Sequence, residues 1–206
     1  ALNNEFAGWD SYLQALESGS DRVAVVGVTD YASIAGYERV IQERPTRSSL
    51  QKFALILPNI ELRISPETRD GKGINLHILV DPSESDHIDH IKSALGRLTF
   101  EFREMTYACT PSDLARLGKA FNSNLEGASA LREGCNQFKP SFDKFKEWWN
   151  SEGWLKKSSI VATANSSSDG ASGIQHDNGF RALREELYRF THAIFSGRPS
   201  DRTYFL

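Results

Sequence analysis

The chain has little of several features that would place it quickly in a class of proteins. It holds 15 glycines and 7 prolines in 206 residues, which excludes a collagen-like or linker-like chain. Its two cysteines, Cys109 and Cys135, have no second pair with which to form a four-thiolate zinc site. We therefore expect buried, unpaired thiols and a reducing, cytoplasmic location.

Long apolar runs and an excess of positive charge are also missing. The longest apolar runs, residues 23–28 and 53–57, are too short to cross a bilayer, so we expect no membrane partner. Lys and Arg number 24 against 27 Asp and Glu, so no bulk basic field marks a nucleic-acid-binding protein. What the chain does have is 39% hydrophobic and 11% aromatic residues, enough to fold as one globular domain.

Strand-like and helix-like patterns alternate along the chain. Apolar runs predict strands over residues 22–28, 52–57, 60–64, 73–80 and 158–164. Helical spacing predicts helices over residues 9–17, 33–44, 83–95, 110–121, 141–149 and 180–190. The valine-rich run 22–28 suits a strand buried on both faces. Strand followed by helix, repeated, favours an α/β fold with a largely parallel sheet.

Asp30 lies where ligands of α/β proteins are usually found, beyond the carboxyl end of a strand. It follows the strand predicted over residues 22–28. Two interpretations stay open for this carboxylate: it is a turn or helix-capping residue, or it is a ligand in a site.

Two other strands place polar side chains on one face at mid-strand. Because side chains alternate along a strand, Glu61 and Arg63 lie opposite the apolar side chains between and beside them. Their face is either solvated or part of an anion-binding cavity. His77 alternates in the same way within residues 74–80, and is either a hydrogen-bonded structural residue or a ligand. A carboxylate and an imidazole together suit zinc, manganese or iron.

Four early segments and two late ones carry a family resemblance. The early segments are Gly27-Val28-Thr29-Asp30-Tyr31, Ile34-Ala35-Gly36-Tyr37, Pro58-Asn59-Ile60-Glu61-Leu62-Arg63 and Asn75-Leu76-His77-Ile78-Leu79, and the late ones are residues 166–173 and 193–197. Together they resemble the PHP (polymerase and histidinol phosphatase) family. More narrowly, the chain is similar to the PHP domains at the N-terminus of large bacterial AAA-like ATPases.

The resemblance implies a distorted β/α barrel with a centre of divalent metal ions (zinc, manganese or iron) that hydrolyses phosphate esters. By position it makes Asp30, Glu61 and His77 metal ligands, and Arg63 becomes the candidate for balancing charge on the phosphoryl oxygens. It also implies that residues 1–206 form a single domain of a longer protein with a C-terminal AAA-like ATPase region. A nucleotide or nucleic acid is then a candidate partner.

Two departures from the family pattern leave two hypotheses open. The His-x-His pair of the family's metal site would fall just before Ala1, and Tyr31, whose phenol is a poor ligand, replaces a histidine. In the first hypothesis the chain lacks the opening strand of a barrel, which typically needs about 250 residues, and belongs to a phosphoesterase. In the second, it is a catalytically inactive PHP-like module that binds a ligand and regulates the attached ATPase.

Four further histidines lie outside these segments, and one of them, His192, is expected to be structural. His176 follows the polar, glycine-rich stretch 165–173, whose backbone amides could cradle a phosphate, and we predict that it is a catalytic residue. His87 and His90 share one face of a predicted polar helix, and we expect that face to be solvated. The aromatic residues within 142–154 are expected in the core or at an interface with another domain.

Overall fold

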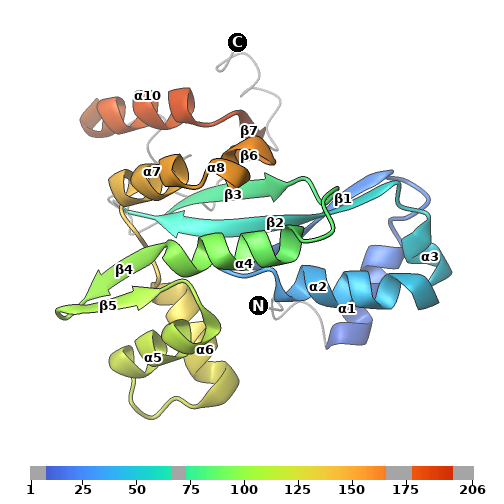
Figure 1. Ribbon diagram of the computed structural model, residues 1–206, viewed down its shortest axis with the longest axis horizontal. Coiled ribbons are helices and arrows are strands. Elements are labelled where there is room, and N and C mark those ends of the chain that lie inside the picture. Colours follow the sequence, from blue (N-terminus) through green and yellow to red (C-terminus); the bar gives the residue numbers. More distant parts are fainter. Residues whose placement is uncertain (1–7, 66–72, 166–177, 197–206) are drawn as a thin grey trace.

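The computed structural model describes residues 8–65, 73–165 and 178–196, and its centre is a five-stranded sheet (Figure 1). The strand order across the sheet is β1-β2-β3-β6-β7. These strands are β1 (Val25–Tyr31), β2 (Leu55–Ile64), β3 (Ile74–Val80), β6 (Ser159–Asn165) and β7 (Ala193–Ser196). The pairs β1–β2 and β6–β7 are parallel, whereas β3 is antiparallel to both of its neighbours.

The α/β class is confirmed, the predicted largely parallel sheet is interrupted by one antiparallel strand, β3, and the barrel is not confirmed. Within the described ranges the sheet is open, with β1 and β7 as its two edges. The connection from β2 to β3 spans only residues 65–73. A crossover between parallel strands needs a dozen or more residues, so this short connection returns the chain antiparallel to β2.

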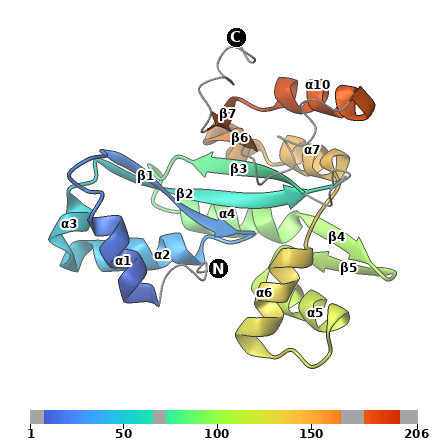
Figure 2. The same ribbon diagram turned by 180° about the vertical axis from the view of Figure 1, so that it is seen from behind.

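Six of the nine helices in the described part of the chain match predicted ones, and the helices that lie over β1, β2 and β3 are on one side of these strands (Figure 1 and Figure 2). They are α1 (Trp9–Glu17), α2 (Ala35–Glu43), α3 (Ser48–Gln51), α4 (His87–Arg97), α5 (Pro111–Phe121), α6 (Gly127–Gln137), α7 (Phe142–Ser151), α8 (Gly153–Lys157) and α10 (Arg181–Phe190), with 3-10 turns η1 (Arg44–Thr46) and η2 (Asn178–Phe180). Helix α4 crosses one side of β2 and β3 (Figure 1). Seen from the other side, none of the described helices lies over β1, β2 and β3 (Figure 2).

The two faces of the sheet therefore differ in what their side chains meet. The covered face, toward α4, carries apolar side chains at most 2% exposed: Ile56, Ile60, Leu62, Ile64, Ile74, Leu76, Ile78 and Val80. The open face carries the alternate side chains, which are mostly polar in its middle: Thr29, Tyr31, Asn59, Glu61, Arg63, Asn75 and His77. Because successive side chains on a strand point to opposite faces, adjacent residues of one strand belong to different sets.

Two strand predictions need correction. Pro58 and Asn59 do not separate two strands, because β2 continues through both residues. Pairing with β3 begins only at Asn59, so the missing N–H of Pro58 falls where β2 has one paired neighbour. The first strand is not buried on both faces: β1 is an edge strand, and Val25 on its open face is 53% exposed.

A second layer of structure, which the sequence patterns did not fully predict, follows α4. The hairpin of β4 (Thr99–Phe102) and β5 (Met105–Ala108) leads into an antiparallel pair of helices, α5 and α6. These helices touch through glycines, because a Cβ atom at Gly134 would lie 1.7 Å from the backbone oxygen of Leu114. The predicted N-cap is confirmed, since the Thr110 hydroxyl accepts a hydrogen bond from the Asp113 amide.

The remaining expectations about the core are also met. Cys109 and Cys135 are both buried and unpaired. The aromatic side chains of α7 belong to the core, and the Trp148 indole donates a 2.8 Å hydrogen bond to the backbone oxygen of Ala94 in α4. In the part of the chain that is described, no helix is both long and apolar enough to cross a bilayer.

Candidate functional site

The open face brings the predicted polar residues of three strands into one row. Tyr31 of β1 pairs with Glu61 of β2, and Glu61 pairs with His77 of β3. Two residues further along β2, Arg63 pairs with Asn75. Side chains directly opposite each other on paired strands have Cβ atoms about 4.5–5.5 Å apart, so these groups are close enough to act on one ligand.

Tyr31 and Arg63 form the centre of this row. An Nη2 proton of Arg63 is donated to the Tyr31 hydroxyl at 2.6 Å, and both side chains lie within 3.4 Å of the Asn75 amide oxygen. Burial, followed by the neighbouring Glu61 carboxylate, raises the pKa of Tyr31 to about 12. The phenol is therefore protonated at neutral pH, and it hydrogen-bonds to both Glu61 and Arg63.

His77 is held by the amide of a residue that the sequence places between two predicted strands. Its Nδ1 lies 3.2 Å from the Asn59 amide oxygen, and the Asn59 amide nitrogen donates to the Thr29 hydroxyl at 2.8 Å. With the amide in that orientation, Nδ1 carries the proton and Nε2 is the basic nitrogen. Metal-binding histidines are oriented in this way by a hydrogen bond to their other nitrogen. Asn59 shares the two-residue period of Glu61 and Arg63, which could have revealed it.

Gly73 provides the room in which Arg63 lies. A Cβ atom at position 73 would come within 2.2 Å of Cγ and 2.4 Å of Cδ of Arg63. These atoms are near the root of the side chain, so an alanine would force the guanidinium to another position. The predicted strand began at this residue, but its glycine carried no sequence signal of a role in the site.

Asp30 faces the opposite way from the other predicted metal ligands. Its register partner is Ile60, on the covered face, and its carboxylate accepts hydrogen bonds from the amides of Gly36 at 2.7 Å and Tyr37 at 3.3 Å. Burial raises the pKa of Asp30, although these two amides act against that rise. Of its two interpretations the structure supports the capping one, because the carboxylate satisfies the first turn of α2. Asp30 is thus not brought together with Glu61 and His77.

The donor set on the open face fits a divalent metal only in part. Glu61 and His77 are cross-strand neighbours on one face and supply the oxygen and nitrogen ligands that zinc, manganese or iron accept. Protein sites for these metals usually have three or more protein ligands, and the described residues supply two here. The guanidinium of Arg63 lies beside them as a fixed positive charge. His176, the other predicted catalytic residue, lies outside the described residues.

A second group of metal-ligand type lies at the start of α4. The ligand atoms of Glu84, Asp86 and His90 all lie within 4.8 Å of one another, and all three residues are exposed. Trp154 of α8 stacks on the His90 ring at 4.6 Å and donates its indole proton to Glu84 at 2.8 Å. This group could hold a divalent ion.

The solvated face expected for His87 and His90 is only half right. His87 is 8% exposed, and its Nε2 lies 2.9 Å from the hydroxyl of Tyr37. Its Nδ1 lies 2.6 Å from the backbone oxygen of Glu84. The helix also starts at His87 rather than near residue 83, so the histidine is turned inward toward α2. Sequence spacing alone could not show that α2 would cover this side.

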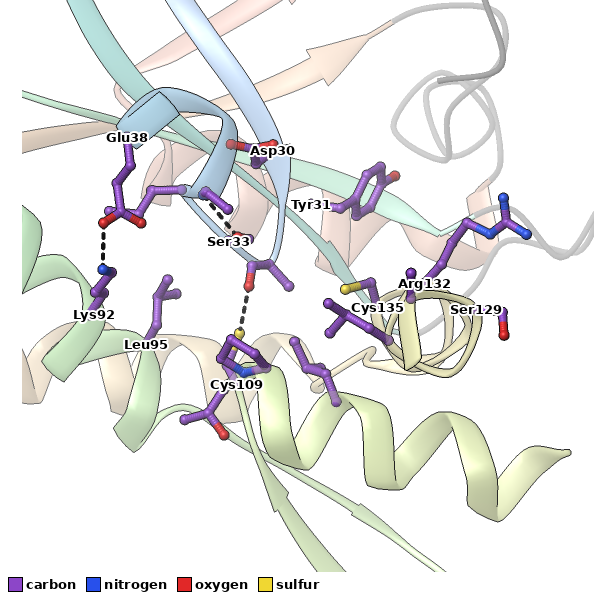
Figure 3. Close-up of a pocket in the computed structure, with 18 residues that line it drawn as sticks. Asp30, Tyr31, Ser33, Glu38, Lys92, Leu95, Cys109, Ser129, Arg132 and Cys135 are labelled. Atoms are coloured by element: carbon purple, nitrogen blue, oxygen red, sulfur yellow. Dashed lines mark hydrogen bonds and ion pairs between the residues drawn. The ribbon is translucent and has the colours of Figure 1, made fainter. Parts of the chain in front are cut away.

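A cavity of about 740 Å³ lies next to the carboxyl end of β1 (Figure 3). Its walls come from residues 30–35, which end β1 and begin α2, and from helices α4, α5 and α6. Figure 3 shows Tyr31 and Arg132 toward one end of the cavity and Glu38 and Lys92 toward the other. The cavity was not predicted, because it forms between segments that are far apart in sequence.

Comparison with known proteins adds no relationship to this geometry. No protein-family model matches the chain, and no curated protein is significantly similar to it.

Proposed function

We propose that the open face binds a phosphate ester and that the protein is a metal-dependent phosphoesterase of PHP type. The observation that carries the proposal is the row formed by Glu61, His77 and Arg63, in which an oxygen ligand, an oriented nitrogen ligand and a cation face the same side. Glu61 and His77 would hold the metal, with zinc, manganese and iron as the candidates for this donor set. Further ligands would come from outside the described residues.

The roles of the individual side chains follow from their contacts. A bound divalent metal supplies an activated water and polarises a phosphoryl oxygen. Arg63 offers guanidinium N–H donors in a planar fork that matches two oxygens of a phosphoryl group. Tyr31 and Asn75 hold that fork in place. Asn59 keeps the proton of His77 on Nδ1, so that Nε2 is the ligand atom.

A second candidate is a non-catalytic PHP-like module that binds an anionic ligand and regulates an attached AAA-like ATPase. Two observations favour it: the Asp30 carboxylate is occupied with capping α2, and Tyr31 is bound to Arg63. Because Asp30 and Tyr31 already bind protein groups, neither would serve as a metal ligand. In this candidate the open face binds a phosphate through Arg63 and is not a complete metal centre.

Hydrolysis of model phosphate esters distinguishes the two candidates. The full-length protein would be assayed with p-nitrophenyl phosphate and bis-p-nitrophenyl phosphate in the presence of Mn²⁺. We expect Mn²⁺-dependent hydrolysis that is lost in Glu61→Gln and kept in Glu101→Gln, a matched change at an exposed glutamate on β4. Hydrolysis no greater than that of Glu61→Gln would reject the phosphoesterase and leave the binding module.

A further inference from the structure

The cavity beside β1 shares one residue with the row of polar groups on the open face. Tyr31 is one of the residues that line the cavity, and its hydroxyl is bound by Arg63 on the open face. Tyr31 therefore forms the wall between the two. A ligand that extends past Tyr31 would therefore reach both Arg63 and the cavity.

Most polar groups that line the cavity are already committed to protein partners. Asp30 binds two amides of α2, the Ser33 hydroxyl accepts from the Ala35 amide, and Glu38 forms an ion pair with Lys92. The Cys109 thiol donates to the backbone oxygen of Ala32 at 3.4 Å. What these groups leave for a ligand is the apolar part of the wall, which includes Ile34, Ala35, Leu95, Leu114, Ala128 and Leu131.

One positively charged side chain that lines the cavity is not engaged by another described residue. Arg132 of α6 is exposed and has no hydrogen bond or ion pair with any of the described residues. It lies toward the Tyr31 end of the cavity (Figure 3). The cavity thus combines an apolar interior with a cationic end next to the open face. Its volume is within the range of about 300–1,000 Å³ that is typical of small-molecule sites.

We propose that this cavity binds the organic group of the substrate, and that the substrate is a phosphate ester of an aromatic or similarly bulky apolar alcohol. The phosphoryl group lies against Arg63 on the open face, and the ring system lies in the cavity between α6 and the segment after β1. This proposal rests on the proposed function for the position of the phosphoryl group. It adds the substrate class and a specificity site.

Binding of two phosphonates tests the proposal without requiring catalysis. Methylphosphonate and 1-naphthylmethylphosphonate have the same anionic end and a C–P bond that phosphoesterases do not hydrolyse, and only the second carries a ring system. Calorimetry on the full-length protein should show the naphthyl compound binding about tenfold or more tightly, because its rings leave water for an apolar wall. Equal affinities would overturn the proposal.

Two alanines provide a matched pair of variants. Ala128 is exposed at the cavity and Ala15 is exposed on α1 away from it. Ala128→Phe should remove the preference for the naphthyl compound and leave the affinity for methylphosphonate unchanged, whereas Ala15→Phe should change neither. A preference that survives in a folded Ala128→Phe protein would place the rings elsewhere and contradict the proposal.

The Cys135 thiol gives a readout on the unaltered protein. It lines the cavity at 8% exposure, so a bound ring system should slow its reaction with a thiol reagent. The naphthyl compound should protect it and methylphosphonate should not, whereas equal labelling rates would count against the proposal. These outcomes are independent of catalysis. An inactive protein that prefers the naphthyl compound overturns only the phosphoesterase, and an active one without the preference overturns only the cavity proposal.

Discussion

The two faces of one sheet place similar side chains in very different surroundings. Asp30, near the end of β1, and Glu61, in the interior of β2, are carboxylates on neighbouring parallel strands, and the register offsets them by one residue. On the covered face, Asp30 meets the amides that begin α2. On the open face, Glu61 meets Tyr31 and faces its cross-strand partner His77. One step along a strand thus separates a carboxylate that stabilises the fold from one that is placed to bind a ligand.

The largest difference between the faces should be in stability. Leu62 is 1% exposed on the covered face, between Glu61 and Arg63 on the open face. We expect Leu62→Ala to lower the free energy of unfolding by about 2–5 kcal/mol, because it removes buried methyl groups and leaves a cavity. Glu61→Gln should change it by less than about 1 kcal/mol. Urea denaturation of both variants measures the contrast, and equal losses would show that the open face is also part of the core.

A smaller effect, with a defined pH dependence, is expected for Asp30. Asp30→Ala should cost about 0.5–2 kcal/mol of stability, as the loss of a helix cap does. Burial raises the pKa of Asp30 above its ordinary 3.8, so the ionised form is less favourable in the folded than in the unfolded state. The stability of the wild type should therefore fall, relative to Asp30→Asn, as the pH rises above about 4. Thermal unfolding of both proteins across the acidic range checks the sign, and an opposite trend would contradict this environment for Asp30.

The smallest effect on stability is expected for a substitution of Gly73, which should mainly weaken the binding of an anion by Arg63. Gly73→Ala would displace Arg63 from Tyr31 and Asn75, with a loss of about 1 kcal/mol for part-buried hydrogen bonds. Methylphosphonate affinity should fall several-fold. Gly96→Ala is the control, because a Cβ atom there meets only Thr110 Cγ2 at 3.7 Å. Unchanged phosphonate binding in Gly73→Ala would mean that Arg63 does not hold the anion.

The features that depend on neighbouring residues were predicted well from the sequence. The helix Trp9–Glu17 and the cap at Thr110 are formed by contacts within one turn, so spacing and residue type determine them. The alternation of Ile60, Glu61, Leu62 and Arg63 likewise predicted a polar face that the register of β2 and β3 confirms. Each of these predictions needed only local sequence.

The features that depend on distant residues could not be predicted in the same way. The face on which Asp30 lies is fixed by its pairing with Ile60, thirty positions later in the chain. His87 is buried because Tyr37 of another helix reaches it. The cavity exists because α6 and the segment after β1 fold beside each other. Periodicity indicates that a strand has two faces, but only the tertiary structure shows which face a given helix covers.

Metal binding by three variants tests the central claim, that the open face is the ligand-binding face and Asp30 is structural. All would carry His90→Ala, so that the exposed group at the start of α4 does not contribute. Mn²⁺ affinity, measured by electron paramagnetic resonance of the free ion, should be the same in His90→Ala and in His90→Ala with Asp30→Asn. It should fall at least about tenfold when Glu61→Gln is added instead. Loss of Mn²⁺ binding in the Asp30 variant, with retention in the Glu61 variant, would contradict the account.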